Sequence, residues 1–432
     1  MLAVLRDTTY RRLFSAKVVA LLGTGLLTVA LGLLAFDIAG SSAGAVMGTA
    51  LTIKMLAYVG FAPVVNALVA RLPKKPVLIG ADLVRAGMAL CLPFITEAWQ
   101  IYVVTFLLQS ASATFTPTFQ SLIPSVLKDE RDYTRALSLS RLAYDLEALA
   151  SPALAALLLT RVSYSNLFLG TVAGFLVSAG LVAVTMLPAP DAAPGTTGSL
   201  WQRTTLGTRI FWRNGRLRSL LALNLVVAAP TALVLVNSVV YVREVLRRPE
   251  TDLALVLACF GVGSMLVALS APALLARYGD RAVMMAGAAL IPVVLAGVTA
   301  LTFRAAALAG SGPGWWWLPA LWFLLGAGNS TILTPSARLL REASTEHTRP
   351  YVFTAQFSLS HACYMVAYPL AGWLGAAAGL GPMAAALTIL ATLGTAAAFA
   401  AWPARDAGAA DAAEEEEGSG ETHAGRRTGQ RR

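Results

Sequence analysis

Charged residues are scarce in this chain. Only 13% of its 432 residues are Asp, Glu, Lys or Arg, whereas 57% are hydrophobic and the mean hydropathy is +0.67. Soluble domains carry about 25% charged residues, so this composition excludes an ordinary soluble protein. Cysteine and histidine are scarcer still, with three of each. Cys91, Cys259 and Cys363 fall in separate apolar runs, which argues against a disulfide framework.

Catalytic and metal-binding signatures are missing as well. The chain contains no HExxH, paired CxxC, Walker loop or nucleophile elbow. A membrane-embedded enzyme that acts on lipid would need a nucleophile, an acid and a base gathered near one interface, and we find no such set. We therefore expect neither an enzyme nor a bound cofactor.

Long hydrophobic runs, in contrast, fill most of the chain. A helix needs about 20 apolar residues to cross a bilayer, and we count about twelve runs of that length. They lack the period-2 alternation of barrel strands, so the sequence predicts an all-α membrane protein with twelve transmembrane helices. The runs cover residues 13–36, 43–66, 77–95, 99–122, 136–160, 166–187, 219–242, 252–276, 282–303, 316–338, 351–377 and 383–402.

The net charge of +10 reflects topology rather than nucleic-acid binding. If the N-terminus is cytoplasmic, the cytoplasmic segments hold 24 of the 33 Lys and Arg residues, and the external loops hold five. The positive-inside rule then predicts a multi-pass protein of the bacterial inner membrane, with both termini cytoplasmic and the first span retained as an anchor. Four basic residues fall within the apolar runs: Lys17, Lys54, Arg85 and Arg141.

The chain repeats itself at close to half its length. Phe106-Leu107-Leu108 recurs as Phe323-Leu324-Leu325, and Ser151-Pro152 has its counterpart 217 residues later in Tyr368-Pro369. Such repetition predicts two six-helix halves with the substrate site where they meet. Pro152 and Pro369 each interrupt a span among small residues, either as matching helix kinks that act as hinges or as a shared packing feature.

Composition divides the chain into four parts. We expect six-helix bundles over residues 1–187 and 219–402, joined by a cytoplasmic linker at 188–218. The linker starts rich in Pro and Gly and continues with apolar residues separated by arginines. This pattern fits either a helix on the inner membrane face or a solvated connection. Residues 403–432 have no core to bury, and we predict a disordered cytoplasmic tail.

Ionisable residues inside spans are costly and therefore mark function. Lys54 and Glu147 each lie about 16 Å into their spans, near the middle of a hydrocarbon core about 30 Å thick. Lys54 should therefore face a water-filled cavity or pair with a carboxylate. Its charge either has a function in transport or only locks two helices together. A carboxylate at that depth is suited to take up and release a proton. We expect the coupling proton on Glu147, or on Asp145 if its i, i+4 pair with Arg141 opens.

Two further charges lie near the inner end of the third span. Asp82 and Arg85 are spaced i, i+3 and follow the basic turn that contains Arg71. We expect Arg71, Asp82 and Arg85 to form a cytoplasmic gate that is made or broken as the halves rock. Plain anchoring of the span by positive charge is the alternative.

Polar side chains in otherwise apolar helices indicate where a cavity runs. Hydrogen bonds between packed helices are the alternative use of such residues. We assign the substrate cavity to seven residues of the fourth and tenth spans: Gln109, Ser112, Thr116, Gln120, Asn329, Ser330 and Thr334.

His361 and Cys363 are the only weak candidates for a transition-metal site. Residues at i, i+2 do not face the same point on a helix, and no third ligand lies near them in sequence. We therefore predict no metal site.

The layout and several motifs resemble the major facilitator superfamily over about residues 5–402. The segment Asn66-Ala-Leu-Val-Ala-Arg71-Leu-Pro-Lys74-Lys75 is similar to its signature loop, with Asn66 in place of the usual glycine and Ala70 in place of the usual acid. The segment Glu147-Ala-Leu-Ala-Ser151-Pro152 is similar to the Gly-Pro element that exporters of the family carry in span five.

Within that family, the segments 135–147 and 357–363 resemble bacterial exporters of the siderophore- and nickel-resistance type. Nickel exporters of this type are expected to have a histidine-rich tail, whereas His423 is the one histidine of the tail here. The resemblance implies that spans 1, 4, 7 and 10 line the cavity. Spans 2, 5, 8 and 11, which hold Lys54, Glu147 and His361, would form the interface between the halves.

These observations predict a monomeric secondary transporter that exports a small molecule in exchange for protons by alternating access in the lipid bilayer. The alternative is an exporter of a divalent metal, nickel or cobalt. Three or more His, Cys, Asp or Glu side chains converging in the cavity would identify the metal exporter.

Overall fold

Helices make up all the regular structure of the described part of the chain. The computed structural model describes residues 2–61, 72–127, 129–187, 200–304, 313–345 and 348–402, and no β-strand occurs within these ranges. The helices are α1 (Thr8–Ala39), α2 (Ala43–Leu56), α4 (Lys74–Cys91), α5 (Ala98–Val126), α6 (Glu130–Leu159), α7 (Tyr164–Ala183), α8 (Leu200–Arg213), α9 (Gly215–Val240), α10 (Glu250–Phe303), α12 (Trp317–Glu342), α13 (Arg349–Pro369), α14 (Gly375–Ala378) and α15 (Leu380–Ala401). The predicted disordered tail at 403–432 lies outside the described residues.

Polar side chains cap the first turns of α1, α5 and α9. The Asp7 carboxylate accepts a hydrogen bond from the Tyr10 backbone N–H at 2.7 Å and starts α1. Asn214 does the same for α9, whose Arg216 N–H lies 2.9 Å from the Asn214 side-chain oxygen. Glu97 and Gln100 form a reciprocal capping box at the start of α5. The caps satisfy backbone donors that the apolar interior of a bilayer would leave without partners.

Six helical segments among the described residues are long and apolar enough to cross a membrane. Two of them, Thr8–Gly60 and Glu250–Phe303, have 53 and 54 residues, which is more than twice the roughly 20 residues of one crossing. Glu250–Phe303 breaks at Gly279, whose φ of 75° and ψ of 164° lie outside the helical region and favour glycine. The number of twelve spans stays a prediction.

Four more helices are long enough to cross a bilayer but are more polar: α5, α6, α12 and α13. They carry the residues predicted to line the substrate cavity, such as Gln109 and Asn329, and also the proton-coupling candidate Glu147 and His361. Polar residues on membrane helices face a hydrated interior rather than lipid. The position of these four helices therefore decides where a hydrated path can run.

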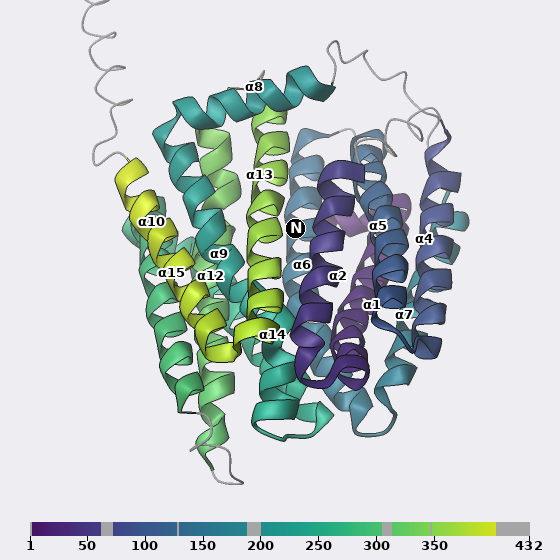
Figure 1. Ribbon diagram of the computed structural model, residues 1–432. Helices are drawn as coiled ribbons and strands as arrows, with labels where there is room; N and C mark the ends of the chain where they lie inside the picture. Colours follow the sequence, from purple (N-terminus) through teal and green to yellow (C-terminus); the bar gives the residue numbers. More distant parts are fainter. Residues whose placement is uncertain are drawn as a thin grey trace, which may run out of the picture.

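The long helices stand side by side, and α8 lies across one end of them (Figure 1). We call this the α8 end and the opposite one the far end. Helix α1 packs against α6 and α7, and α4 packs against α5 and α7. Helix α10 packs against α12 and α15, and α9 packs against α15. Helix α2 packs against α1 and α5 of the first group, and α13 packs against α9 of the second. Contacts of α2 with α13 and of α6 with α10 join the two groups of helices.

Toward the far end, α2 touches the five-residue π-helix η7 (Leu370–Leu374) at a pair of glycines. A Cβ atom on Gly48 would lie 2.8 Å from the Gly372 Cα and 2.8 Å from the Tyr368 carbonyl oxygen. The Trp373 indole N–H donates to the Thr49 hydroxyl at 3.0 Å across the same contact. The absence of side chains at this crossing lets the two backbones meet directly.

We predict that Gly48→Ala destabilises the protein through this crossing. The added methyl overpacks a backbone contact, which costs about 1–3 kcal/mol. Thermal unfolding of the purified protein in detergent measures the effect as a lowered Tm. Gly87→Ala in α4 is the matched control, because a Cβ atom there meets nothing within 4 Å. An unchanged Tm for Gly48→Ala, or an equal loss for Gly87→Ala, would contradict the prediction.

Candidate functional site

Three ionisable residues from three helices lie near enough to one another for their charges to interact. Lys54 lies in the last turn of α2, Glu147 in the middle of α6 and His361 in α13. Lys54 and Glu147 interact electrostatically as opposite charges, and the Lys54 charge also acts on His361. Lys54 and Glu147 are both half-buried. We call these residues the Lys54–Glu147–His361 cluster.

Close packing of α1 on α6 fixes the position of Glu147. Ser151 has no exposed surface and packs directly against Gly25 of α1, leaving no room for a Cβ atom on the glycine. Such an atom would also lie 3.3 Å from Oε1 of Glu147. The glycine therefore lets the carboxylate, Ser151 and α1 come together at one level of the bundle.

Aromatic rings surround His361. Its ring stacks on Tyr58 with centroids 5.6 Å apart, and it lies 4.1 Å from the Phe357 ring. Nδ1 of His361 is 2.7 Å from the Phe357 carbonyl oxygen. A carbonyl oxygen only accepts hydrogen bonds, so Nδ1 carries the proton and Nε2 is the nitrogen that can take up another.

His361 and Cys363 do not share a ligand site. The Cys363 Sγ lies 4.0 Å from the Leu221 carbonyl oxygen of α9, whereas His361 faces Tyr58, which follows α2. Within the described residues, no group of three or more His, Cys, Asp or Glu side chains could hold one metal ion.

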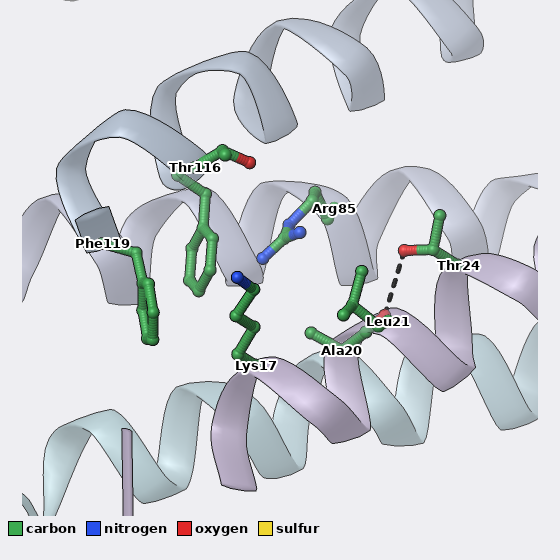
Figure 2. Close-up of a pocket in the computed structure, with 8 residues that line it drawn as sticks. Lys17, Ala20, Leu21, Thr24, Arg85, Thr116 and Phe119 are labelled. Atoms are coloured by element: carbon green, nitrogen blue, oxygen red, sulfur yellow. Dashed lines mark hydrogen bonds between the residues drawn. The ribbon is translucent and has the colours of Figure 1, made fainter. Parts of the chain in front are cut away.

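A second set of charges surrounds a small cavity of about 40 Å³ between α1, α4 and α5. Figure 2 shows the Lys17 amine and the Arg85 guanidinium pointing toward each other beside Thr116 and Phe119. Lys17 lies over the Phe119 ring at 5.3 Å. Both basic residues are only 5% exposed. A cavity of this size holds a few water molecules at most.

Arg85 is held within one group of helices. It forms an ion pair with Asp82 and lies over the rings of Phe115 and Phe175 at 4.3 and 4.5 Å. The other Asp82 oxygen accepts a hydrogen bond from the Ser178 hydroxyl at 2.7 Å. These contacts join α4 to α5 and α7, so the pair meets as its i, i+3 spacing predicts. The gate role of Asp82 and Arg85 stays a prediction, and Arg71 lies outside the described residues.

Some of the residues predicted to line the substrate cavity form hydrogen bonds within or between helices, and others line a cavity or are exposed. Asn329 donates from its amide to the Thr231 hydroxyl at 2.9 Å, which ties α12 to α9, and Gln109 is buried. Ser330 and Thr334 share a hydrogen bond of 3.1 Å, and Ser112 donates to the Leu108 carbonyl at 3.0 Å. Thr116 lines the cavity of Figure 2, whereas Gln120 is exposed.

The remaining predicted positions are the two prolines and Asp145. Pro369 ends α13, and the chain continues from it as the π-helix η7. Pro152 lies inside the uninterrupted α6. The Asp145 side chain lies outside the described part, so its proton-carrying role stays a prediction.

Comparison with known proteins identifies the family. Residues 13–291 match the Major Facilitator Superfamily. This match covers more than half of the chain, so the protein belongs to this family of membrane transporters. Solved transporters share its fold. A mutant of the nucleoside transporter NupG superposes with a TM-score of 0.71 at 15% identity, covering 91% of this chain and all of that one. A bacterial homolog of the human lysosomal transporter Spinster gives a TM-score of 0.69 at 10% identity, covering 93% and 99%.

Curated relatives match part of the sequence. Macrolide efflux protein A of Streptococcus pyogenes is 25% identical over 181 residues, which is 41% of this chain and 44% of that protein. Macrolide efflux protein A of Enterococcus faecalis is 26% identical over 152 residues, or 33% and 47%. The chain therefore matches less than half the length of these relatives.

Sequence reasoning missed two residues of these clusters. Lys17 is a lysine within an apolar run, the same signal that singles out Lys54, but its position near the end of a span gives no indication of a role. Tyr58 has no signal of its own, because an aromatic residue is ordinary in an apolar helix. Only the tertiary contact with His361 gives it a place in the site.

We predict that Asp82→Asn strongly destabilises the protein. Removing one partner of a buried ion pair costs about 3–5 kcal/mol, because the other charge stays in a low-dielectric interior. Chemical or thermal unfolding in detergent measures the loss. Glu342→Gln is the control, since it breaks an exposed pair with Arg338 that contributes about 1 kcal/mol at most. Equal effects of the two substitutions would refute the prediction.

Proposed function

We propose that this transporter has twelve membrane-spanning helices in two six-helix halves and exports an amphipathic organic molecule in exchange for protons. The observation that carries the proposal is that Lys54 of α2 and Glu147 of α6 lie near enough for their opposite charges to act on each other. Helix α2 also contacts α13, and α6 also contacts α10. A change of charge on Glu147 therefore changes the electrostatic forces on helices of both groups.

Protonation supplies the switch in this scheme. An ionised Glu147 attracts Lys54, and a protonated one does not, so the proton sets how strongly α2 and α6 are held together. Moving between these two arrangements exposes the carboxylate to one side of the membrane and then to the other. Proton entry can then drive the substrate out, which is alternating access with antiport.

An organic substrate agrees with the surroundings of the cluster. Tyr58, Phe357 and His361 present aromatic rings rather than a set of metal ligands. The similarity to the two macrolide efflux proteins supports export of a bulky, largely apolar compound. The chain would act as a monomer, since the site is assembled from helices of one copy.

We predict that Glu147→Gln loses proton-driven transport. The amide keeps the shape of the side chain but cannot exchange a proton, so an imposed pH gradient no longer drives accumulation of a radiolabelled macrolide in inside-out vesicles. We expect at least about a tenfold loss, within the range that one essential proton-transfer group contributes.

Glu244→Gln is the matched control, because Glu244 is exposed and follows α9 toward the far end. It should accumulate the macrolide as the unmodified protein does. Full gradient-driven accumulation by Glu147→Gln would dismiss Glu147 as the coupling group. Absence of macrolide transport by the unmodified protein would dismiss the substrate class.

The excess of basic residues in the segments at the α8 end supports a cytoplasmic location for that end. We predict that Ser163→Cys, in the loop before α7, reacts with a membrane-impermeant maleimide added to intact cells. Thr345→Cys, which follows α12 at the α8 end, should react only in broken cells. Both changes are made in a variant that lacks the three native cysteines. The reverse labelling pattern would overturn the proposed orientation.

A further inference from the structure

Helix α8 has one face fixed against the bundle. Phe211 is only 1% exposed, and Gly207 packs directly against the Tyr351 carbonyl oxygen and the Ala355 Cβ in the first two turns of α13. A side chain at position 207 would push α8 away from α13. The rotation of α8 about its own axis is therefore set by this contact.

The opposite face of α8 is exposed and mixes arginine with apolar residues. Successive helix residues are about 100° apart, which places Leu206, Arg209, Trp212 and Arg213 on one arc of about 120°. All four are exposed, with Trp212 at 60% and Leu206 at 43%. The two arginines lie in the middle of the arc, and the leucine and tryptophan lie at its edges.

The charge on this face is of one sign. The sequence contains no Asp or Glu between Asp191 and Glu244. Arg209, Arg213 and Arg218 are exposed, and no carboxylate among the described residues forms an ion pair with any of them. The surface is thus a cationic patch with an apolar border.

The position of α8 decides which partner can reach this patch. Figure 1 shows α8 lying across the ends of helices that cross the membrane, so its axis runs along the membrane surface. Tryptophan and leucine beside arginines are the residues that settle at the boundary of headgroups and acyl chains. Negative phosphate groups of lipids in this leaflet complement the arginines in charge.

We propose that the exposed face of α8, with Arg218 at the start of α9, binds the headgroups of anionic phospholipids. We call Arg209, Arg213 and Arg218 the α8 arginines. Each contributes an electrostatic attraction to the phosphate layer, while Leu206 and Trp212 insert among the first acyl carbons. Because the buried face of α8 is packed on α13, the lipid contact holds α13 as well. The inference depends on the family and not on the direction of transport or on the coupling proton.

The test measures lipid binding to the full-length protein in neutral detergent by native mass spectrometry. Phosphatidylglycerol is the probe, and phosphatidylcholine is the zwitterionic reference. We expect the triple variant Arg209→Gln, Arg213→Gln, Arg218→Gln to bind phosphatidylglycerol more weakly, by about fivefold for each arginine removed. Binding of phosphatidylcholine should not change.

The matched control removes three exposed arginines from loops at the far end: Arg161→Gln, Arg247→Gln and Arg304→Gln. It changes the net charge by the same amount and should keep the phosphatidylglycerol affinity of the unmodified protein. The proposal is overturned if the α8 variant binds phosphatidylglycerol as tightly as the unmodified protein, or if the control loses as much affinity.

Two further measurements guard against a variant that fails to fold. Changing the α8 arginines to lysine keeps the charge, so this variant should retain the preference for phosphatidylglycerol. Raising the salt to 1 M shortens the Debye length to about 3 Å and should abolish the preference in the unmodified protein. A preference that is lost with lysine, or that persists at 1 M salt, would contradict the electrostatic proposal.

Discussion

Burying a charge in a low-dielectric interior is the constraint on which this structure depends. Several of the described ionisable side chains in the interior are stabilised by a partner. Asp82 pairs with Arg85 and accepts from Ser178, Lys17 lies over an aromatic ring, and Lys54 lies within reach of the Glu147 charge. Such contacts are costly to break inside a membrane protein, so they fix which helices stay together.

The two charged clusters differ in what they join. The Asp82–Arg85 pair connects α4 with α5 and α7, both of which pack against α4, and it therefore stiffens one group of helices. The Lys54–Glu147–His361 cluster draws on α2, α6 and α13, of which α13 packs mainly with the other group. In the proposed mechanism, the Asp82–Arg85 pair stabilises one group of helices permanently, and the interaction of Lys54 with Glu147 is the one that changes with protonation. The glycine contact of α2 with η7 supplies an uncharged contact between the groups toward the far end.

Much of the fold could be predicted from the sequence, because apolar length alone identifies helices in a bilayer. The break at Gly279 falls in the predicted gap between the runs at 252–276 and 282–303. The i, i+3 spacing of Asp82 and Arg85 is compatible with the ion pair that the structure contains, whereas their predicted gate role stays a prediction. Lys54 and Glu147 have equal depth in their predicted spans, which predicts that they lie at one level of the membrane. Depth alone does not predict which faces of the two helices are turned toward each other. The rotation of a helix about its own axis is set by tertiary packing, which the sequence does not show. For this reason the sequence did not predict that Gln120 is exposed or that Lys17 faces Arg85.

Proton release on substrate binding tests the central claim most directly. In weakly buffered detergent solution near neutral pH, macrolide binding to the purified protein should release protons, because the substrate binds with the ionised form of Glu147 and draws the protonated fraction toward it. The Glu147→Gln variant should bind the macrolide and release none. The same proton release from this variant and from the unmodified protein would contradict the account.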